Sequence, residues 1–505
     1  MLRIPMAFRG WGRRAARSEG KSLLVDIRPV LFINGILLLI LAAAMGVPLL
    51  VDLATEHREW QAFALPLMIT GFIGLALIFT NQGDGTPLLR TRQAFLLTGS
   101  SWLAVAIFSA LPFQASDLPL SWTDCYFETI SGITTTGATV LTGLDLLPHA
   151  ILMWRALLQW LGGAGVILTA VVLLPVLRIG GMQMFHMANV DEGERATPRL
   201  PQMAWKMLGV YALFSALLAG GLCLAGMTPL EAVCHAMSSL ATGGFSTSDQ
   251  SLGHFSHAAR WLCMLGMIAG GATFSQYVAP WRRGHWTILG DSQLRWYLLT
   301  IAVFAMLVTF WNWAVGDMEA REAFFASAFN VVSVLTTSGF HAGQYDSWGG
   351  FAQVAFFVMM FIGGCTGSTA GGIKIFRYQL LFAVSGVHIR RLLHPHGVFP
   401  VLFNRFRVSD PVVRSILGFV LLYFVCFAVL VVALTLSGLD TLTSFSGAAA
   451  SLGNIGPGLG PLIGPGGSYQ ALPDFAKWLL TFGMLLGRLE LVPLLILFTP
   501  AFWRE

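Results

Sequence analysis

The chain has 505 residues, of which 55% are hydrophobic and only 11% are charged. This balance, with a mean hydropathy of +0.71, excludes an ordinary water-soluble domain and predicts a protein embedded in the lipid bilayer. A net charge of +5 does not indicate a nucleic-acid partner. The six cysteines show neither the framework of a disulfide-rich domain nor the spacing of a metal site, so we interpret them as small packing residues.

The chain begins with an arginine-rich segment, residues 1–29. We predict a cytoplasmic tail rather than a targeting signal, because the apolar run that follows, Val30–Val51, is too long for a signal peptide and lacks a clean cleavage site. Residues 30–82 contain this run and a second one, Ala64–Thr80, joined by a short charged link. They predict two extra transmembrane helices that stand outside the pattern that follows.

From residue 93 onward the sequence repeats one arrangement: an apolar helix, a short half-helix, a small polar loop and a second apolar helix. The repeats occupy residues 93–178, 203–281, 294–386 and 412–500. We therefore predict an all-α polytopic membrane protein with four pseudo-symmetric units around one pore and ten transmembrane helices in all. Basic residues gather on the loops of one side, including Arg90, Arg92, Arg178, Arg195, Arg199, Arg282, Arg283, Arg390 and Arg391. By the positive-inside rule, both termini lie in the cytoplasm and the four polar loops open from outside.

The four polar loops carry a glycine at matching positions, and we predict that together they form a cation filter. Each half-helix is expected to point its carbonyl end, the negative end of its dipole, at a common axis. Glycine lets successive backbone carbonyls face inward, where they can replace the hydration shell of K⁺. The predicted potassium ligands, mainly backbone carbonyls, belong to Thr135, Thr136, Gly137, Thr242, Gly243, Gly244, Thr337, Ser338, Gly339, Asn454, Ile455 and Gly456.

The fourth loop contains no threonine, so the pore is not expected to be strictly four-fold. Three acidic residues, Asp145, Asp249 and Asp346, follow the first three loops and could concentrate cations at the outer mouth. The alternative is that the loops are four tight turns with incidental aspartates. K⁺ is the expected transported ion, and no organic cofactor is expected.

The half-helices have recognisable start signals. Thr228–Glu231 is a capping box with proline at the first helical position, and Ser121–Asp124 is a weaker version of it. Asp317 and Asp440 are expected to cap the third and fourth half-helices.

The glycine-rich stretch 363–374 interrupts the second apolar helix of the third repeat. Irregular backbone at membrane depth must line a cavity or be buried by protein, so we predict a movable plug below the filter; a simple packing break is the alternative. A phosphate-binding loop is excluded, because Ile373 stands where that motif requires lysine. The predicted gating residues in this stretch are Gly363, Gly364, Gly367, Ser368, Gly371, Gly372 and Lys374.

A single arginine, Arg488, is predicted in the middle of the last spanning helix. A charge at that depth is costly and usually faces a cavity or a partner, so we add Arg488 to the gating residues. A purely structural ion pair is the alternative, although Glu490 is too near along the helix to share its face. Glu128 and Arg155 are interpreted as a structural pair behind the first loop.

Taken with the four loops in order, the segments WRALLQWLGGAG (Trp154–Gly165) and GGCTGSTAGGIK (Gly363–Lys374) resemble the TrkH branch of the Trk/Ktr/HKT superfamily of potassium transporters. The likeness runs from about Val30 to the C-terminus and leaves out the basic tail. It implies that the four glycines go with potassium selectivity, that a serine in place of Gly137 would go with sodium passage, and that the glycine-rich stretch is an intramembrane gating loop with Arg488 as a barrier beneath the filter.

The resemblance also implies a homodimer with one pore per subunit, a cytoplasmic nucleotide-binding regulatory partner of the TrkA type, and residence in a bacterial cytoplasmic (inner) membrane. Potassium uptake is therefore the expected function, with a proton- or sodium-coupled potassium symporter as the alternative. Four units that all face the same way argue against the inverted repeats common in symporters. A membrane enzyme is disfavoured, because no metal-ligand spacing or nucleophile–base pair is found.

Overall fold

The computed structural model describes residues 26–55, 60–83, 89–172, 200–278, 290–404 and 406–504. These ranges form a helical assembly whose strands are one short hairpin, β1 (Leu402–Phe403) and β2 (Phe406–Arg407). The predicted helical membrane class is confirmed. The basic tail before residue 26 and five of the predicted cytoplasmic arginines, Arg178, Arg195, Arg199, Arg282 and Arg283, lie outside the described residues.

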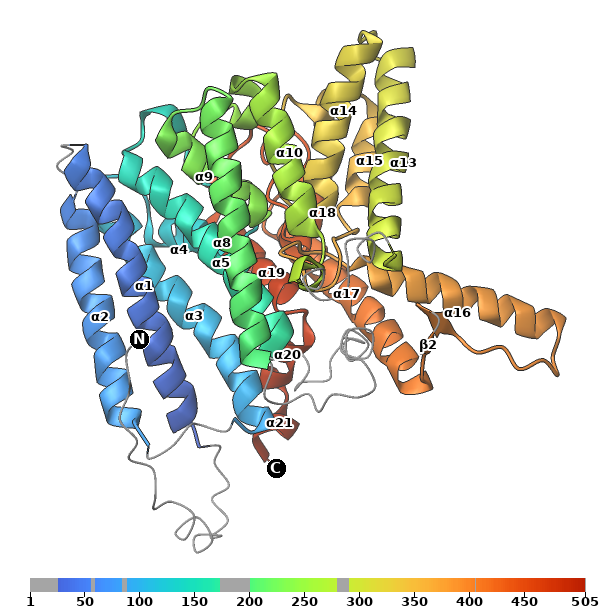
Figure 1. Cartoon of the computed structure of the whole chain (residues 1–505), viewed down its shortest axis with the longest axis horizontal. Coiled ribbons are helices and arrows are strands. Elements are labelled where there is room, and N and C mark those ends of the chain that lie inside the picture. The colour runs from blue at the N-terminus through green and yellow to red at the C-terminus, as the bar shows by residue number, and fades with distance from the viewer. Residues whose placement is uncertain are drawn as a thin grey trace, which may run out of the picture.

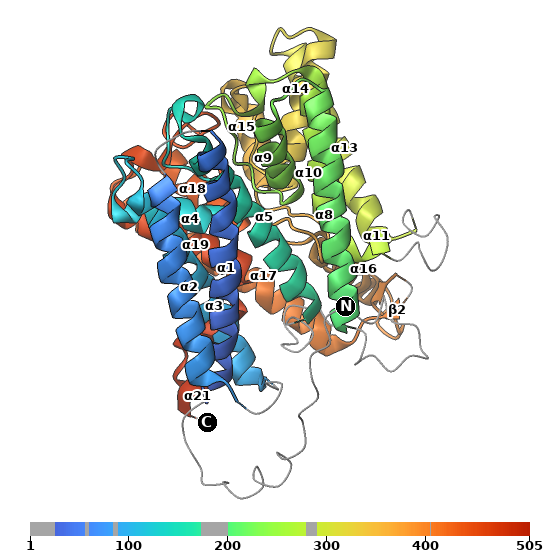
Figure 2. The same cartoon turned by 60° about the vertical axis from the view of Figure 1, so that its left-hand side comes forward.

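Two long helices, α1 (Arg28–Ala54) and α2 (Gln61–Asn81), pack side by side at one edge of the assembly (Figures 1 and 2). They approach closely where Gly35 faces Gly74. A Cβ on Gly35 would lie 2.8 Å from the Gly74 carbonyl oxygen, and one on Gly74 would lie 3.0 Å from that of Gly35. Small residues are used in this way where membrane helices need close backbone contact.

The remaining helices follow in four successive groups. The first group is α3 (Thr91–Ala115), α4 (Trp122–Ile133) and α5 (His149–Val172). The second is α8 (Leu200–Leu224), α9 (Pro229–Leu240), α10 (His257–Gly271) and α11 (Phe274–Val278). The third is α13 (Ser292–Ala314), α14 (Ala320–Leu335), α15 (Gly350–Met359) and α16 (Ile375–Leu393). The fourth is α17 (Asp410–Leu436), α18 (Thr441–Gly453), α19 (Asp474–Arg488), α20 (Val492–Leu495) and α21 (Pro500–Arg504).

Short 3₁₀ turns lie in the loops that connect these helices. They are η3 (Leu144–Leu146), η4 (Ser251–His254), η6 (Tyr345–Ser347), η7 (Tyr469–Ala471) and η8 (Ile496–Phe498). The half-helices α4, α9, α14 and α18 all end near the middle of the assembly (Figure 1).

Seven of the described helices are long and apolar enough to cross a membrane, and an eighth span results if α19 and the segment after it are counted as one. The predicted count of ten therefore stays a prediction. Three second helices are broken rather than continuous. Helix α10 stops at Gly271 before the short α11, α15 and α16 are separated by residues 360–374, and the chain bends by 114° after α19.

The capping predictions were correct for three half-helices. The Ser121 and Thr228 hydroxyls accept from the Asp124 and Glu231 amides in complete capping boxes, and Asp440 accepts from the Thr443 amide. The prediction for Asp317 was wrong. It lies before the helix with φ of 53°, in a turn closed by a hydrogen bond from the Met318 amide to the Asn312 carbonyl. Helix α14 therefore starts later, after Glu319, without a side-chain cap.

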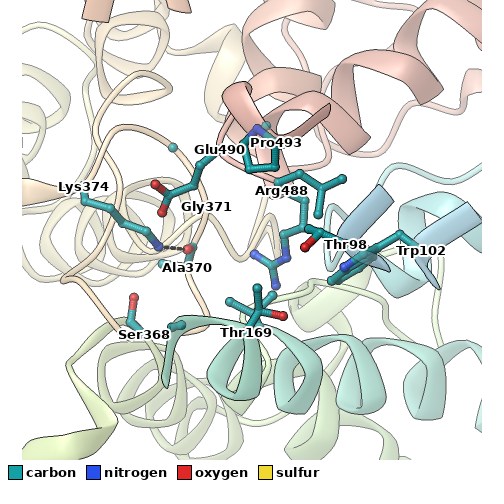
Figure 3. A pocket seen from close by; sticks show the side chains of 16 residues that line it. Thr98, Trp102, Thr169, Ser368, Ala370, Gly371, Lys374, Arg488, Glu490 and Pro493 are labelled. Atoms are coloured by element: carbon teal, nitrogen blue, oxygen red, sulfur yellow. Dashed lines mark hydrogen bonds between the residues drawn. The ribbon is translucent and has the colours of Figure 1, made fainter. Parts of the chain in front are cut away.

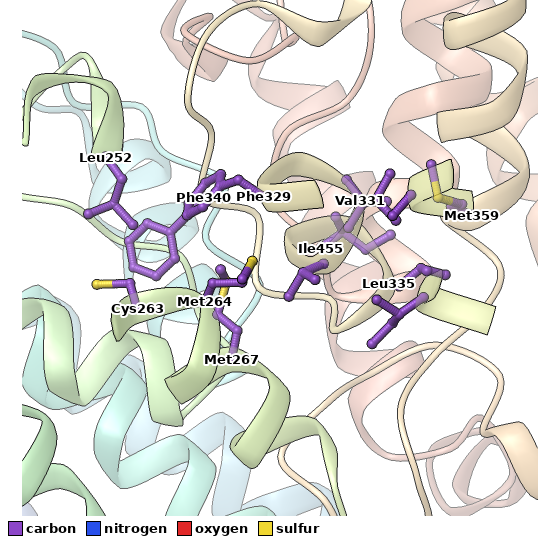
Figure 4. Packing of buried hydrophobic residues seen from close by; sticks show 14 of the residues in the cluster. Leu252, Cys263, Met264, Met267, Phe329, Val331, Leu335, Phe340, Met359 and Ile455 are labelled. Carbon is purple, nitrogen blue, oxygen red and sulfur yellow. The ribbon is translucent and has the colours of Figure 1, made fainter. Parts of the chain in front are cut away.

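A cluster of buried apolar side chains surrounds the ends of the half-helices from outside (Figure 4). Phe340, which follows the third loop glycine, is fully buried beside Leu252 and Cys263. Ile455, which precedes the fourth loop glycine, is fully buried in the same cluster. The apolar packing therefore reaches up to the polar loops and fixes them from behind.

Candidate functional site

The four half-helices end in the same backbone motif. In each, an amide hydrogen bonds back to the carbonyl five residues earlier, at N–O distances of 2.8 Å in the first three loops and 2.9 Å in the fourth. The donors of these bonds are Thr136, Gly243, Ser338 and Ile455. This is the Schellman type of helix end, which requires a left-handed residue just before the donor.

The left-handed residue is not glycine in any of the four loops, as it would be at most helix ends. The residues are Thr135 (φ 51°), Thr242 (φ 51°), Thr337 (φ 57°) and Asn454 (φ 52°). A β-branched residue in this region is strained, so three threonines here mark a conformation that the surrounding structure enforces. We call these four the left-handed residues.

Two residues after each left-handed residue stands a glycine that also has positive φ, at 87° for Gly137, 82° for Gly244, 79° for Gly339 and 103° for Gly456. A Cβ built on any of them would come closer than 3.0 Å to a carbonyl oxygen of another loop. Glycine is therefore required for two reasons, its backbone angles and the absence of space.

The four loops contact one another in a closed cycle. The Gly137 Cα lies against the Gly243 carbonyl, Gly244 against Ser338, Gly339 against Ile455, and Gly456 against Thr136. We call the oxygens of Thr136, Gly243, Ser338 and Ile455 the ring carbonyls. A ring of backbone oxygens is the kind of site that binds a hard monovalent cation. All twelve residues predicted as potassium ligands lie in this ring of loops.

The left-handed residues are held by side-chain bonds. The Thr135 hydroxyl accepts from Arg488 Nη2 at 2.5 Å, and the Thr337 hydroxyl accepts from the Gly371 amide at 2.6 Å. The Thr242 hydroxyl lies 3.1 Å from that of Thr369. Three of the four loops are thus joined to Arg488 or to the glycine-rich stretch 363–374.

The fourth left-handed residue, Asn454, is held differently. Its Nδ2 donates to the Met484 carbonyl at 2.9 Å and to the Thr136 hydroxyl at 3.0 Å. Asparagine adopts left-handed backbone more readily than threonine, and its amide reaches both the last helix and the first loop. The expected departure from four-fold symmetry is therefore visible in how this loop is fastened.

The stretch 363–374 is irregular and is buried by protein rather than exposed to lipid. Its amides bond outward: Cys365 to the Gly271 carbonyl at 2.9 Å, Thr369 to the Gly270 carbonyl at 3.1 Å. A Cβ on Gly364 would lie 2.6 Å from the Gly271 carbonyl oxygen, and one on Gly371 would collide with the Gly453 carbonyl. The predicted gating glycines therefore let this stretch lie directly against the ends of α10 and α18.

Arg488 does not stand in the middle of a helix, as the sequence predicted, but is the last residue of α19. Its Nη1 donates to the Thr369 carbonyl at 2.8 Å, and its Nη2 donates to Thr135. In the described part of the chain it forms no ion pair. Glu490, two residues later, instead binds Arg377 of α16 at 2.5 Å. Arg488 therefore joins the first loop to the glycine-rich stretch through neutral oxygens.

A cavity lies next to Arg488, none of the ring-carbonyl residues lines it, and Figure 3 shows the side chains that do. Lys374 and Glu490 point into it along with Arg488 (Figure 3). Lys374 Nζ donates to the Ala370 carbonyl. Thr98 and Trp102 of α3 and Thr169 of α5 also line it. Two cations and one carboxylate thus share one chamber beneath the loops.

Behind the first loop, the predicted pair of Glu128 and Arg155 is confirmed, with Nε and Oε1 2.8 Å apart and both side chains at most 1% exposed. Arg155 also donates to the Ser246 carbonyl at 2.9 Å and the Thr139 hydroxyl at 3.1 Å. Glu128 accepts from the Val140 amide. One ion pair therefore fixes the irregular segments that follow both the first and the second loop.

The outer aspartates mainly bind loop backbone. Asp249 accepts from the Leu144 amide at 3.1 Å, and Asp145 accepts from the Asp249 amide at 3.3 Å. Burial raises the pKa of the Asp346 carboxyl. These contacts fit a structural role, and their effect on cations at the mouth stays a prediction.

Sequence reasoning missed three polar residues at this site. Lys477 of α19 pairs with Asp124 of α4 at 2.6 Å, and the Tyr469 hydroxyl donates to the Gly456 carbonyl at 2.7 Å. Gln159 of α5 bonds to the second loop through both ends of its amide. The available signal for Lys477 and Gln159 was a polar side chain inside an apolar helical segment, whereas Tyr469, flanked by Ser468 and Gln470, carried no such signal.

The fold and the site together define a multi-pass helical membrane protein with a ring of backbone carbonyls at its centre. The model of the TrkH family, described as a cation transport protein, matches residues 59–505. The chain is 40% identical to the Trk system potassium uptake protein TrkI of Halomonas elongata, over 94% of this chain and 97% of that protein. It is 35% identical to the Trk system potassium uptake protein TrkH of Escherichia coli K12, over 95% of this chain and 100% of that protein.

A solved structure agrees with these sequence matches. The crystal structure of the potassium transporter TrkH from Vibrio parahaemolyticus superimposes with a TM-score of 0.88 and 34% identity, covering 95% of this chain and 100% of that one. The chain belongs to the TrkH family of cation transport proteins, as the sequence resemblance indicated. Members of this family are transporters and not enzymes.

Proposed function

We propose that this protein mediates potassium uptake across a bacterial cytoplasmic membrane, through a selectivity filter made of backbone carbonyls from the four loops. One observation carries the proposal: the loop glycines and ring carbonyls contact each other in a closed cycle. The relatives TrkI and TrkH are named potassium uptake proteins, which supports K⁺ as the ion. Backbone oxygens around an axis would replace the hydration shell of this ion.

Passage is controlled, in this proposal, by the stretch 363–374 together with Arg488. The stretch bonds to the second and third loops through Thr369 and Gly371, so it occupies the space immediately below the ring. The guanidinium of Arg488 is fastened to the first loop. Two unit charges repel by about 3 kcal/mol at roughly 5 Å and an effective dielectric near 20, so this charge opposes a cation that leaves the ring.

The stretch 363–374 would have to move for rapid flux. Its described contacts with neighbouring elements are hydrogen bonds rather than apolar packing alone, and they reach α10, the second and third loops and Arg488. Helix α16 extends away from the bundle (Figure 1). The ion pair between Arg377 and Glu490 connects this helix to the turn that directly follows Arg488. A cytoplasmic nucleotide-binding partner of the TrkA type would act through such a connection.

The complete assembly we propose is a homodimer in the bilayer, with one pore per subunit, ten transmembrane helices and both termini in the cytoplasm. Repeats at residues 93–178, 203–281, 294–386 and 412–500 each contribute one loop, residues 30–82 supply the two extra helices, and residues 1–29 form a cytoplasmic tail. Crowding of basic residues on one set of loops supports this orientation.

Ion flux in reconstituted vesicles tests the function. Purified protein should carry rubidium down its gradient with no proton or sodium gradient present, and should carry sodium far more slowly. Vesicles without protein are the control. Flux that occurs only when a proton or sodium gradient is imposed would contradict a conducting pore and establish the coupled symporter instead.

A further inference from the structure

The Gln159 side chain contacts one ring carbonyl from behind. It is fully buried on α5, and its Nε2 donates to the Gly243 carbonyl at 2.6 Å. Its Oε1 accepts from the Phe245 amide at 3.1 Å. Because the Phe245 amide can only donate, the orientation of the Gln159 amide is fixed by the backbone itself. One side chain therefore holds the peptides on both sides of Gly244.

The other ring carbonyls lack such a contact. Within the described residues, no donor reaches the oxygens of Thr136, Ser338 or Ile455, whereas the Gly243 oxygen has the Gln159 amide. The ring is therefore asymmetric in its hydrogen bonding as well as in its sequence. An oxygen that already accepts a strong hydrogen bond is fixed in direction and offers less of its negative charge to an ion.

The corresponding positions of the second and fourth groups hold methionine. Gly162, Gly270 and Gly487 lie against the Ile133, Leu240 and Leu452 carbonyls at the ends of three half-helices, which makes these glycines structural counterparts. Gln159, Met267 and Met484 stand three residues before them. All three side chains are at most 1% exposed, but only the glutamine can donate a hydrogen bond.

We propose that Gln159 is a positioning residue that sets ion discrimination at the second loop. It holds the Gly243 carbonyl at the distance and direction that suit K⁺, and it prevents the Gly243–Phe245 peptides from rotating when the smaller Na⁺ enters. This inference rests on the proposed filter function. It assigns a role in selectivity to a buried side chain that lies outside the loop and does not itself contact the ion.

The test compares Gln159→Met with Met267→Leu in reconstituted vesicles, with folded protein measured by size-exclusion chromatography. Gln159→Met gives the first group the side chain found at the corresponding position of the second and fourth groups, so its volume fits while both hydrogen bonds are lost. We expect rubidium-over-sodium discrimination to fall by about fivefold or more, the scale of one buried hydrogen bond. Met267→Leu should leave discrimination unchanged, because that side chain makes no bond to a ring carbonyl.

Two further variants make the result decisive. If Gln159→Met gives no folded protein, Gln159→Glu carries the test under alkaline conditions, because its carboxylate accepts from Phe245 but has no proton for Gly243; discrimination should again fall. Gly137→Ser, in the first loop, tests the filter independently.

Unchanged discrimination in the Gln159 variants alongside a loss in Gly137→Ser overturns only the inference about Gln159. Unchanged discrimination in all variants overturns the filter as well, and an equal loss in Met267→Leu shows a general packing effect and contradicts the inference.

Discussion

The four polar loops and the stretch 363–374 are both irregular, glycine-containing backbone inside a helical membrane protein, yet they are held in different ways. Each loop is closed by amide bonds to its own half-helix, for example from Thr136 to Ser131. The stretch 363–374 has internal bonds too, such as the Gly363 amide to the Ile373 carbonyl, but it also depends on bonds to other elements, at Gly270, Gly271, Thr337 and Arg488. We expect a stretch that depends on its neighbours to move more easily than a loop that is closed on its own half-helix.

Buttressing side chains show the same contrast. The buried pair of Glu128 and Arg155 fixes the segments that follow two of the loops with charge-assisted bonds. The stretch 363–374 is held by neutral side chains such as Gln293 and Thr337 and by the guanidinium of Arg488, which has no carboxylate partner among the described residues. The proposed function needs a rigid site for selectivity and a releasable one for gating, and this contrast supports it.

The largest effect is expected at the rigid region. Arg155→Ala leaves the Glu128 carboxylate buried without its partner, which typically costs about 3–5 kcal/mol of stability. We expect a severe loss of folded protein in thermal unfolding monitored by fluorescence. The double variant Glu128→Gln with Arg155→Met is the matched control, because removing both charges leaves neither uncompensated; an equal loss in both variants would contradict the assigned role of the pair.

A smaller effect is expected at the releasable region. Arg488→Ala removes the positive charge below the ring and the bond to Thr369, so flux should rise; about 3 kcal/mol of repulsion corresponds to roughly a hundredfold. Arg488→Lys keeps the charge and should change flux less. Rubidium flux per folded protein in vesicles is the measurement. Equal or reduced flux in a stable Arg488→Ala protein would rule out the barrier.

The sequence placed the loop glycines because a small polar segment between apolar ones is a local signal. The positive φ of Gly137, Gly244, Gly339 and Gly456 also belongs to the loop itself, whereas the carbonyl that leaves no room for a side chain at each of them belongs to another loop. The capping boxes at Ser121 and Thr228 are likewise contained within one turn of helix.

The features that sequence reasoning missed depend on distant partners. Arg488 ends a helix because Glu490 and Leu491 take positive φ of 57° and 62°, and the Glu490 partner Arg377 lies 113 residues away. Gln159 reaches a carbonyl 84 residues away. No local pattern announces such contacts. The cap predicted at Asp317 was wrong for the opposite reason. Its local sequence signal was present, but a turn that bonds back to the Asn312 carbonyl moved the start of the helix.

The central claim is that the cyclic contact of glycines and carbonyls makes the filter, and Gly137→Ser tests it most directly. A Cβ there would collide with the Gly243 carbonyl, so the ring must distort. Gly143→Ser is the matched control, because Gly143 also has positive φ, 69°, but has nothing within 4 Å of its Cβ position. Both variants would be compared by the ratio of rubidium to sodium flux in vesicles. We predict a fall of roughly tenfold or more for Gly137→Ser, equivalent to about 1.4 kcal/mol, and no change for Gly143→Ser; an unchanged ratio in a folded Gly137→Ser protein would contradict the account.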